Sequence, residues 1–265
     1  MLTLLLSHER SGSHLLGEAI KSLSGTKMFD EVCNPHAVPA NNYEESFHGF
    51  HAAWCRDKIG FLEAPGHKKQ MQFNAAYFDH LQAIAGDANA VVDIKYGHIH
   101  HFEANWWPIF RRPSLFQSCQ VNGIRVLHLH RVNSLEAAVS DEIASQRKIW
   151  HSWQTDTGQP PDEKFEVPIE KVINSALLLI EQSRWINEKW LPGVKSMTVT
   201  YEQISSDLLD DSTGLRKRIG EFVGGSIESS FLPELKKLGR PLSESVANYN
   251  ELIKCCRGTA LESFY

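Results

Sequence analysis

Short apolar runs that alternate with amphipathic segments constrain the fold of this chain more than any other feature of its sequence. Runs this short are typical of strands that are buried on both faces of a sheet. Three such runs lie at 2–6, 91–95 and 124–130, and residues 195–201 alternate between apolar and polar residues as a fourth strand. Apolar residues recur at helical spacing near 13–23, 133–150, 169–190, 213–223 and 246–256. The alternation predicts an α/β fold, in which a central parallel sheet carries helices on both faces.

Two long stretches do not fit this alternation. Residues 40–80 and 102–120 mix aromatic residues, histidines and prolines. We interpret them as helical insertions, or lids, over the edge of the sheet. Because no internal repeat, low-complexity tract or linker divides the chain, we expect residues 1–265 to form a single domain.

The charge and composition of the chain argue against several classes of protein. The 27 Lys and Arg residues are outnumbered by 32 Asp and Glu residues, and the net charge is -5, so we expect no broad basic surface for nucleic acid. No run of 18 apolar residues occurs, which predicts no membrane span. The five cysteines are odd in number and contain no CxxC pair, as in a chain with reduced thiols. Together with the lack of a signal-peptide pattern at Met1, these features predict a cytoplasmic protein.

The turn between the first apolar run and the first helix has the features of an anion-binding loop. It contains Gly12, and the helical pattern begins at Ser13. Such a turn directs backbone N–H groups and the positive end of the helix at one point, where phosphate or sulfate can bind. Arg10 would add a charge, and Ser11 and Ser13 would add hydroxyl donors; the alternative is an ordinary turn in which Ser13 caps the helix. Because neither GxxxxGK[ST] nor GxGxxG occurs, ordinary ATPases and dinucleotide dehydrogenases are not favoured.

A second candidate anion site follows the third apolar run. Arg131 comes directly after this run, and Ser140 lies in the predicted helix that follows. The planar arginine fork and the serine hydroxyl could hold one phosphate; the alternative is an arginine at a strand end and a serine on a solvated helix face. Ligands of parallel sheets bind beyond the carboxyl ends of the strands, so we expect both sites at one edge. Two phosphate sites there suit a nucleotide that is phosphorylated at two ribose positions.

These motifs together resemble those of the sulfotransferases that use 3′-phosphoadenosine 5′-phosphosulfate (PAPS). The segment ERSGSHLL is similar to the loop RSGSTLL of the bacterial carbohydrate (trehalose-type) enzymes, and it departs from that loop at His14. The resemblance implies a P-loop-like three-layer fold. It implies a 5′-phosphosulfate site made by Arg10, Ser11, Gly12, Ser13, His14 and Leu15. It implies a 3′-phosphate site made by Arg131 and Ser140, with Arg257 and Gly258 near the same phosphate, although Arg257 could equally be a surface residue at a helix end.

Sulfuryl transfer between two oxygens requires a base for the acceptor hydroxyl and cations for the leaving phosphate. Glu31 lies where the chain should return to the sheet, and the resemblance implies that it is the base. Lys95 ends the second apolar run and, with Arg10, would stabilise the leaving oxygen. His98 is the alternative base, because a histidine closely follows such a lysine in the cytosolic sulfotransferases.

The histidines after Lys95 also suggest a metal site. His98, His100 and His101 lack an obvious fourth ligand, however, and the resemblance implies PAPS chemistry without a metal. The resemblance therefore implies an enzyme that moves the sulfuryl group of PAPS to a hydroxyl of a carbohydrate or glycolipid and releases adenosine 3′,5′-bisphosphate. A small-molecule alcohol as acceptor, a nucleotide-binding module without transferase activity, and a kinase-like phosphotransferase are the alternatives. Some bacterial members of the family are dimers, so the resemblance is compatible with a homodimer.

Overall fold

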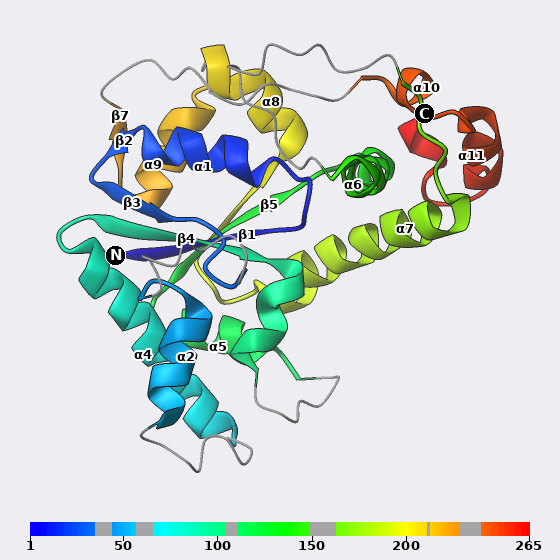
Figure 1. Ribbon diagram of the computed structural model, residues 1–265. Coiled ribbons are helices and arrows are strands. Elements are labelled where there is room, and N and C mark those ends of the chain that lie inside the picture. The colour runs from blue at the N-terminus through cyan, green and yellow to red at the C-terminus, as the bar shows by residue number, and fades with distance from the viewer. Residues whose placement is uncertain (35–43, 57–65, 104–110, 149–162, 211–212, 228–239) are drawn as a thin grey trace.

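A five-stranded parallel sheet forms the centre of the protein (Figure 1). The computed structural model describes residues 1–34, 44–56, 66–103, 111–148, 163–210, 213–227 and 240–265. The strand order is β3-β4-β1-β5-β6, and every neighbouring pair is parallel. The strands are β1 (Leu2–Ser7), β3 (Thr26–Phe29), β4 (Asn89–Lys95), β5 (Arg125–His130) and β6 (Ser196–Thr200). The predicted α/β fold is therefore confirmed.

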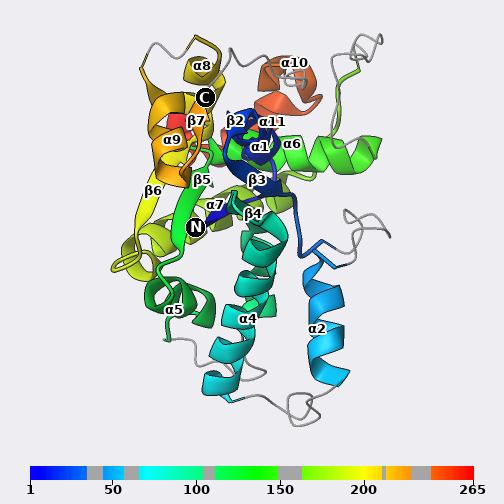
Figure 2. The same cartoon turned by 90° about the vertical axis from the view of Figure 1, so that its left-hand side faces the viewer.

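Helices cover both faces of this sheet, which gives three layers. One face carries α1 (Ser13–Lys21), α8 (Tyr201–Asp210) and α9 (Leu215–Val223), which lie above the sheet in Figure 1. The other face carries α2 (Phe47–Arg56), α4 (His67–Ala85) and α5 (Ser114–Val121). Figure 2 shows α2 and α4 side by side. A short antiparallel pair, β2 (Leu23–Ser24) and β7 (Ser226–Ile227), completes the sheets.

The layers follow from the alternation of side chains along the central strand. Successive residues of a strand point to opposite faces of the sheet. Leu4 and Leu6 of β1 join the core of the layer that contains Phe73 of α4, whereas Leu5 joins the core that contains Ile20 of α1. All three leucines are almost completely buried, and each contributes roughly 1.5–3 kcal/mol through removal of its side chain from water.

A third core lies beside the sheet and holds the C-terminal part of the chain. It is formed by α6 (Ser134–Arg147), α7 (Ile169–Trp185), α10 (Leu242–Ser245) and α11 (Tyr249–Cys256) (Figure 1). The side chain of Asn248 bonds both the N–H and the carbonyl of Val167, at 3.0 and 2.8 Å. These two bonds attach the segment that precedes α11 to the start of α7.

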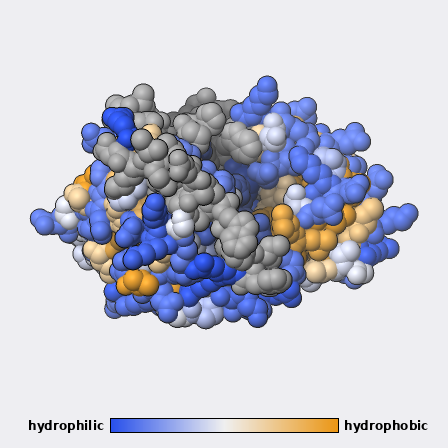
Figure 3. Space-filling view, turned by 90° about the horizontal axis from the view of Figure 1, so that it is seen from below, coloured by the Kyte–Doolittle hydropathy of each residue, from blue (hydrophilic) through white to orange (hydrophobic). Residues whose placement is uncertain are grey.

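The long helix predicted at 169–190 is present, but its last turn differs. The regular helix α7 ends at Trp185, and a π-helical turn follows over Ile186–Trp190. Leu178 and Trp185 of α7 are exposed. Figure 3 views the molecule from below and shows hydrophobic residues gathered on the side where α7 runs in Figure 1.

The described parts of the two predicted insertions are helical. The helices α2 and α4 lie within 40–80, and α4 packs Phe73 and Tyr77 into the core beneath the sheet. The helix α5 occupies most of the described part of 102–120 and buries Phe116. Since α4 connects β3 to β4 and covers the sheet, it is part of the layered core. Residues 40–43, 57–65 and 104–110 lie outside the described residues. That the two insertions lie on the acceptor side of the sheet remains a prediction.

The strand order places the ends of two particular strands at a topological switch point. The chain runs from β1 to β3 and β4 on one side of the sheet, and then to β5 and β6 on the other side of β1. The connections that leave β1 and β5 therefore diverge in opposite directions. In sheets of this kind the crevice beyond the carboxyl ends of such strands binds ligands, so the loops after β1 and β5 are the place to examine for function.

Candidate active site

The loop between β1 and α1 is held in one conformation by its backbone and by a packed tyrosine. Arg10 and Gly12 both have left-handed backbone angles, with φ of 61° and 86°. A side chain at position 12 would place its Cβ 2.6 Å from the ring of Tyr201, so only glycine fits. Gly12, and not Ser13, is the N-cap of α1, and no side chain caps this end. The N–H groups of the first helical turn therefore remain as donors for an anion.

His8 joins this loop to the end of β5. Its Nδ1–H donates to the carbonyl of Glu9 at 2.6 Å, and its Nε2 accepts the backbone N–H of Arg131 at 3.1 Å. The hydroxyl of Ser11 donates to the carbonyl of His8 at 2.6 Å, which closes the turn. Burial lowers the pKa of His8 to about 4, so the ring stays neutral and Nε2 remains an acceptor. The two predicted anion sites are thus fixed relative to each other by one imidazole.

The pKa of His8 predicts that the protein loses stability in mild acid. The folded pKa of about 4 lies below the unfolded value of 6.5, so the unfolded chain binds the proton first. The free energy of unfolding should therefore fall as the pH decreases from 6.5 to 4, by up to about 3 kcal/mol for this group. Urea unfolding at pH 7 and pH 4.5 measures the fall, and His8→Gln should make it smaller. An equal fall in the variant would show that His8 does not titrate in this way.

The second predicted anion site lies directly against the loop. The Nε–H of Arg10 donates to the hydroxyl of Ser140 in α6 at 3.2 Å. The Arg131 guanidinium pairs with Glu136 and lies 4.5 Å from the centre of the Tyr201 ring. The structure thus brings Arg10, Arg131 and Ser140 together at one edge, but it is Arg10, and not Arg131, that contacts Ser140.

Glu31 lies between a histidine and a lysine at the same edge of the sheet. His14 Nε2 is 3.3 Å from Glu31 Oε1, and Lys95 Nζ is 3.6 Å from the same oxygen. The amide of Asn34 donates to Glu31 Oε2 at 2.8 Å. The hydrogen bond from His14, with the charge of Lys95 and the bond from Asn34, holds the pKa of Glu31 far below its usual range. Glu31 also has a φ of 38°, a conformation uncommon for a residue with a side chain and often found at functional sites.

Lys95 connects Glu31 to the anion-binding loop. Its side chain is 4% exposed and donates to Ser13 Oγ at 2.6 Å, to Asp93 Oδ2 at 2.7 Å and to Ser7 Oγ at 3.4 Å. Burial raises the pKa of Asp93, while the charge of Lys95 opposes that rise. The ammonium group is therefore a fixed cation at the point where the loop, β4 and Glu31 meet.

Three residues of this site were not singled out by the sequence analysis. Asp93 shares a face of β4 with Lys95, because the two residues are two positions apart, and this spacing was a usable signal. His8 and Asn34 carried no such signal, since their roles depend on contacts with Arg131 and Glu31. Their bonds to the site appear only when the chain is folded.

The remaining predicted residues occupy different places. His98 lies in the 3-10 helix η2 (Tyr96–Phe102), which begins directly after Lys95. Burial lowers the pKa of His98, and the charge of Glu31 opposes that effect. Leu15 packs against the core formed by α1, α8 and α9. Arg257 is exposed and follows α11, and the N–H of Gly258 bonds to Glu262 at 3.0 Å. Among the described residues no hydrogen bond or ion pair joins Arg257 to Arg131 or Ser140, so its part in a phosphate site remains a prediction.

The described part of the chain contains neither a metal-binding group nor a membrane-spanning helix. There, no three His, Cys, Asp or Glu side chains are grouped so that they could hold a metal ion. None of the described helices has the length and the apolar character that crossing a membrane requires.

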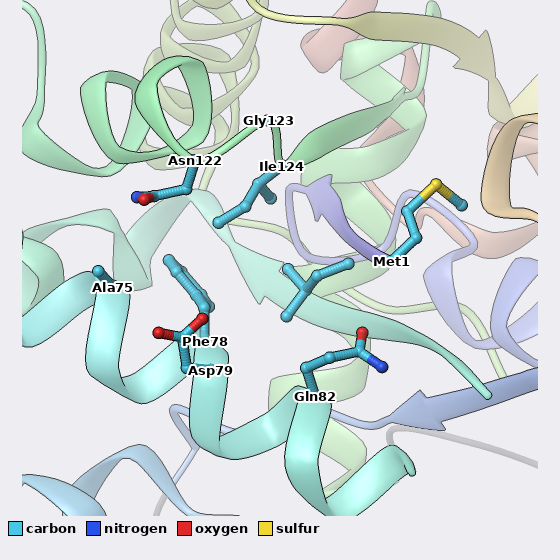
Figure 4. A pocket seen from close by; sticks show the side chains of 9 residues that line it. Met1, Ala75, Phe78, Asp79, Gln82, Asn122, Gly123 and Ile124 are labelled. Atoms are coloured by element: carbon cyan, nitrogen blue, oxygen red, sulfur yellow. The ribbon is translucent and has the colours of Figure 1, made fainter. Parts of the chain in front are cut away.

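A small pocket of about 200 Å³ lies at the opposite edge of the sheet (Figure 4). Its lining includes Leu2 and Ile124, at the amino ends of β1 and β5, and Phe78, Asp79 and Gln82 of α4. Figure 4 shows the side chains of Phe78, Asp79, Gln82 and Ile124 around the pocket. Because ligands of parallel sheets bind at the carboxyl ends of strands, and because the grouped charges lie there, the Arg10 loop is the candidate site.

Comparison with solved structures gives a likeness over most of the chain. No protein-family model matches the sequence, and no curated protein does. Among solved structures, the sulfotransferase domain of the olefin synthase of Synechococcus PCC 7002 aligns over 94% of this chain and 82% of that domain. The TM-score is 0.43 and the sequence identity is 16%. The assignment of function below therefore depends on the residues of this chain.

Proposed function

We propose that this protein is a sulfotransferase that uses PAPS as its sulfate donor and a hydroxyl group, in a carbohydrate or a glycolipid, as acceptor. One observation carries the proposal: two cationic elements, the Arg10 loop and the end of β5, lie side by side next to a carboxylate that contacts a buried lysine. His8 bonds both elements, and Arg10 bonds Ser140. A donor with anionic groups at its 3′ and 5′ positions suits two adjacent sites better than a donor with one.

The residues fit the donor by their chemistry. The uncapped start of α1, with Arg10 and the hydroxyls of Ser11 and Ser13, supplies N–H and O–H donors for a phosphosulfate group. Arg131 supplies a planar fork for a second phosphate. Its partner Glu136 is half-exposed, so the ion pair can exchange for a phosphate at small cost.

Glu31 and Lys95 are assigned to the chemical step. Glu31 accepts the proton of the acceptor hydroxyl while the acceptor oxygen forms its bond to sulfur. The bond between sulfur and the bridging phosphate oxygen breaks, and Lys95 and Arg10 stabilise the charge on that oxygen. Because its pKa is lowered, Glu31 is ionised at neutral pH but is a weak base. It therefore orients the hydroxyl first and receives the proton late in the transfer.

Removal of the Arg131 side chain tests the donor site. We expect adenosine 3′,5′-bisphosphate to bind without Mg²⁺, and Arg131→Ala to weaken that binding by about 1.5–3 kcal/mol, or roughly 10-fold to 150-fold, because a charge-assisted hydrogen bond is lost. Isothermal titration calorimetry in EDTA measures both. Adenosine 5′-monophosphate should bind the variant and the original protein equally, since it has no 3′-phosphate.

Arg125→Ala is the matched control, because Arg125 begins the same strand and donates to the carbonyl of Phe222 at the opposite edge of the sheet. Equal affinity of the Arg131 variant and the original protein for the bisphosphate would refute the 3′-phosphate assignment. Binding that requires Mg²⁺ and ATP would favour a phosphotransferase. Tight binding of PAPS without transfer to any hydroxyl would favour a nucleotide-binding module.

A further inference from the structure

Five imidazoles gather near Glu31, whose charge acts on one of them, His98. His48 and His51 come from α2, and His98, His100 and His101 come from η2. His101 lies at their centre: its ring is 4.0 Å from that of His100, 5.1 Å from that of His48 and 5.9 Å from that of His98. We name this group the histidine cluster.

The histidine cluster is fixed to the transfer site from both of its helices. The helix η2 begins directly after Lys95, the last residue of β4. The ring of His48 donates through Nε2 to the carbonyl of Cys33 at 2.9 Å, and the N–H of Phe47 bonds the carbonyl of Val32 at 3.0 Å. Both carbonyls belong to the turn that follows Glu31. The carboxylate is thus close to His14 of the donor loop and near the histidine cluster, where an acceptor hydroxyl must arrive.

His48, His98 and His100 of the histidine cluster each offer a ring nitrogen to a ligand. The Nδ1 of His98 is buried and has no partner among the described residues. One ring nitrogen of His48 bonds the carbonyl of Cys33, and one ring nitrogen of His100 bonds the carbonyl of Gly97. Each ring has a second nitrogen. A neutral imidazole has one donor and one acceptor, as a hydroxyl group does. Phe47 is buried in the core, 5.5 Å from the ring of His101, and supports the cluster from behind.

The charge of the surroundings selects among acceptors. Burial lowers the pKa of His98, and burial with the neighbouring histidines lowers the pKa of His101 to about 4, so both rings are neutral at neutral pH. The fixed charges that act on His98 are Glu31 and Lys95. Lys95 is already paired with Asp93. An anionic acceptor would thus meet neutral rings and the ionised Glu31, with no free cation among these groups.

We propose that the histidine cluster is the acceptor-binding wall of the enzyme, and that it takes an uncharged polyhydroxylated acceptor in preference to one that carries a carboxylate or a sulfate. This inference rests on the proposed sulfotransferase function. His101, at the centre of the cluster, is the residue that determines the specificity.

Two substitutions of His101 test the inference with a matched pair of sugars, methyl glucoside and methyl glucuronoside. The original protein should transfer sulfate from PAPS to the glucoside with the higher kcat/KM. His101→Leu should raise KM for the glucoside roughly threefold to tenfold, with little change in kcat, since an imidazole that can bond a hydroxyl is replaced by an apolar side chain. His101→Lys should shift the ratio of kcat/KM values toward the glucuronoside by about tenfold, because it adds a fixed cation. The affinity of both variants for adenosine 3′,5′-bisphosphate should stay unchanged, which shows that they fold.

The outcomes separate this inference from the proposed function. Absence of bisphosphate binding and of PAPS turnover would overturn both. Turnover that prefers the glucuronoside, or that occurs on no neutral sugar, would overturn the inference and leave the donor assignment intact. An unchanged KM in His101→Leu would also overturn it, because a ring that contacts the acceptor must affect KM.

Discussion

Replacement of Glu31 by glutamine should lower kcat by roughly 10²–10⁴-fold, the usual range for the loss of a general base. The amide keeps the size of the side chain and can still bond Asn34, but it cannot accept the proton of the acceptor hydroxyl. Because Glu31 contacts His14 and Lys95 and is not part of the predicted phosphate contacts, the affinity for adenosine 3′,5′-bisphosphate should change little. Transfer from ³⁵S-labelled PAPS measures turnover, and calorimetry measures affinity.

Asp30→Asn is the matched control for this substitution. Asp30 precedes Glu31 in the chain, but its carboxylate is half-exposed and pairs with Lys21 on the surface. The same chemical change there should leave turnover close to that of the original protein. Full turnover in Glu31→Gln would remove Glu31 from the mechanism and would make His98 the candidate base.

The dependence of kcat/KM on pH distinguishes the two bases. A low pKa keeps Glu31 ionised through mild acid, so a glutamate base predicts no loss of activity from this group between pH 7 and pH 5. A histidine acts as a base only when it is neutral. If His98 is the base, kcat/KM should fall below pH 6.5 as one group becomes protonated. This fall should be absent in His98→Gln.

The sequence predicted the positions of the site residues best where a residue ends or follows a buried strand. Arg10, Lys95 and Arg131 each follow or end a buried apolar run, and parallel strands bring such residues to one edge. The structure places all three there. Their roles in binding PAPS remain predictions, but their proximity is a consequence of the topology.

The contacts that connect these residues could not be predicted in the same way. His8 looks like one more polar residue of a turn, and its importance depends on the N–H of Arg131, which is far away in sequence. The same holds for the histidine cluster, because α2 and η2 are far apart in sequence and meet through tertiary packing. Local spacing carries no information about such pairs.

The fold shows the same division between local pattern and tertiary context. Strands buried on both faces are apolar throughout, so β1, β4 and β5 are evident from their residues. The edge strand β6 alternates exposed and more buried residues. The predicted strand included Tyr201, but the helix α8 begins there. The ring of Tyr201 packs against Gly12, a contact that no local pattern encodes.

Replacement of Lys95 by methionine should damage both stability and catalysis, for separable reasons. Asp93 is buried with Lys95 Nζ at 2.7 Å. Loss of the ammonium leaves an uncompensated buried carboxylate, which typically costs about 3–5 kcal/mol of unfolding free energy. Loss of the cation at the leaving oxygen should also lower kcat by roughly 10²–10³-fold. Urea unfolding and sulfate transfer measure the two effects independently.

A second substitution separates these effects. Asp93→Asn in the Lys95→Met background removes the stranded charge, so most of the lost unfolding free energy should return. Turnover should not return, because the double variant still lacks the cation beside Ser13 and Glu31. If turnover recovered with stability, Lys95 would act only by supporting the fold, and the charge on the leaving oxygen would have to be stabilised by Arg10 and the α1 backbone alone.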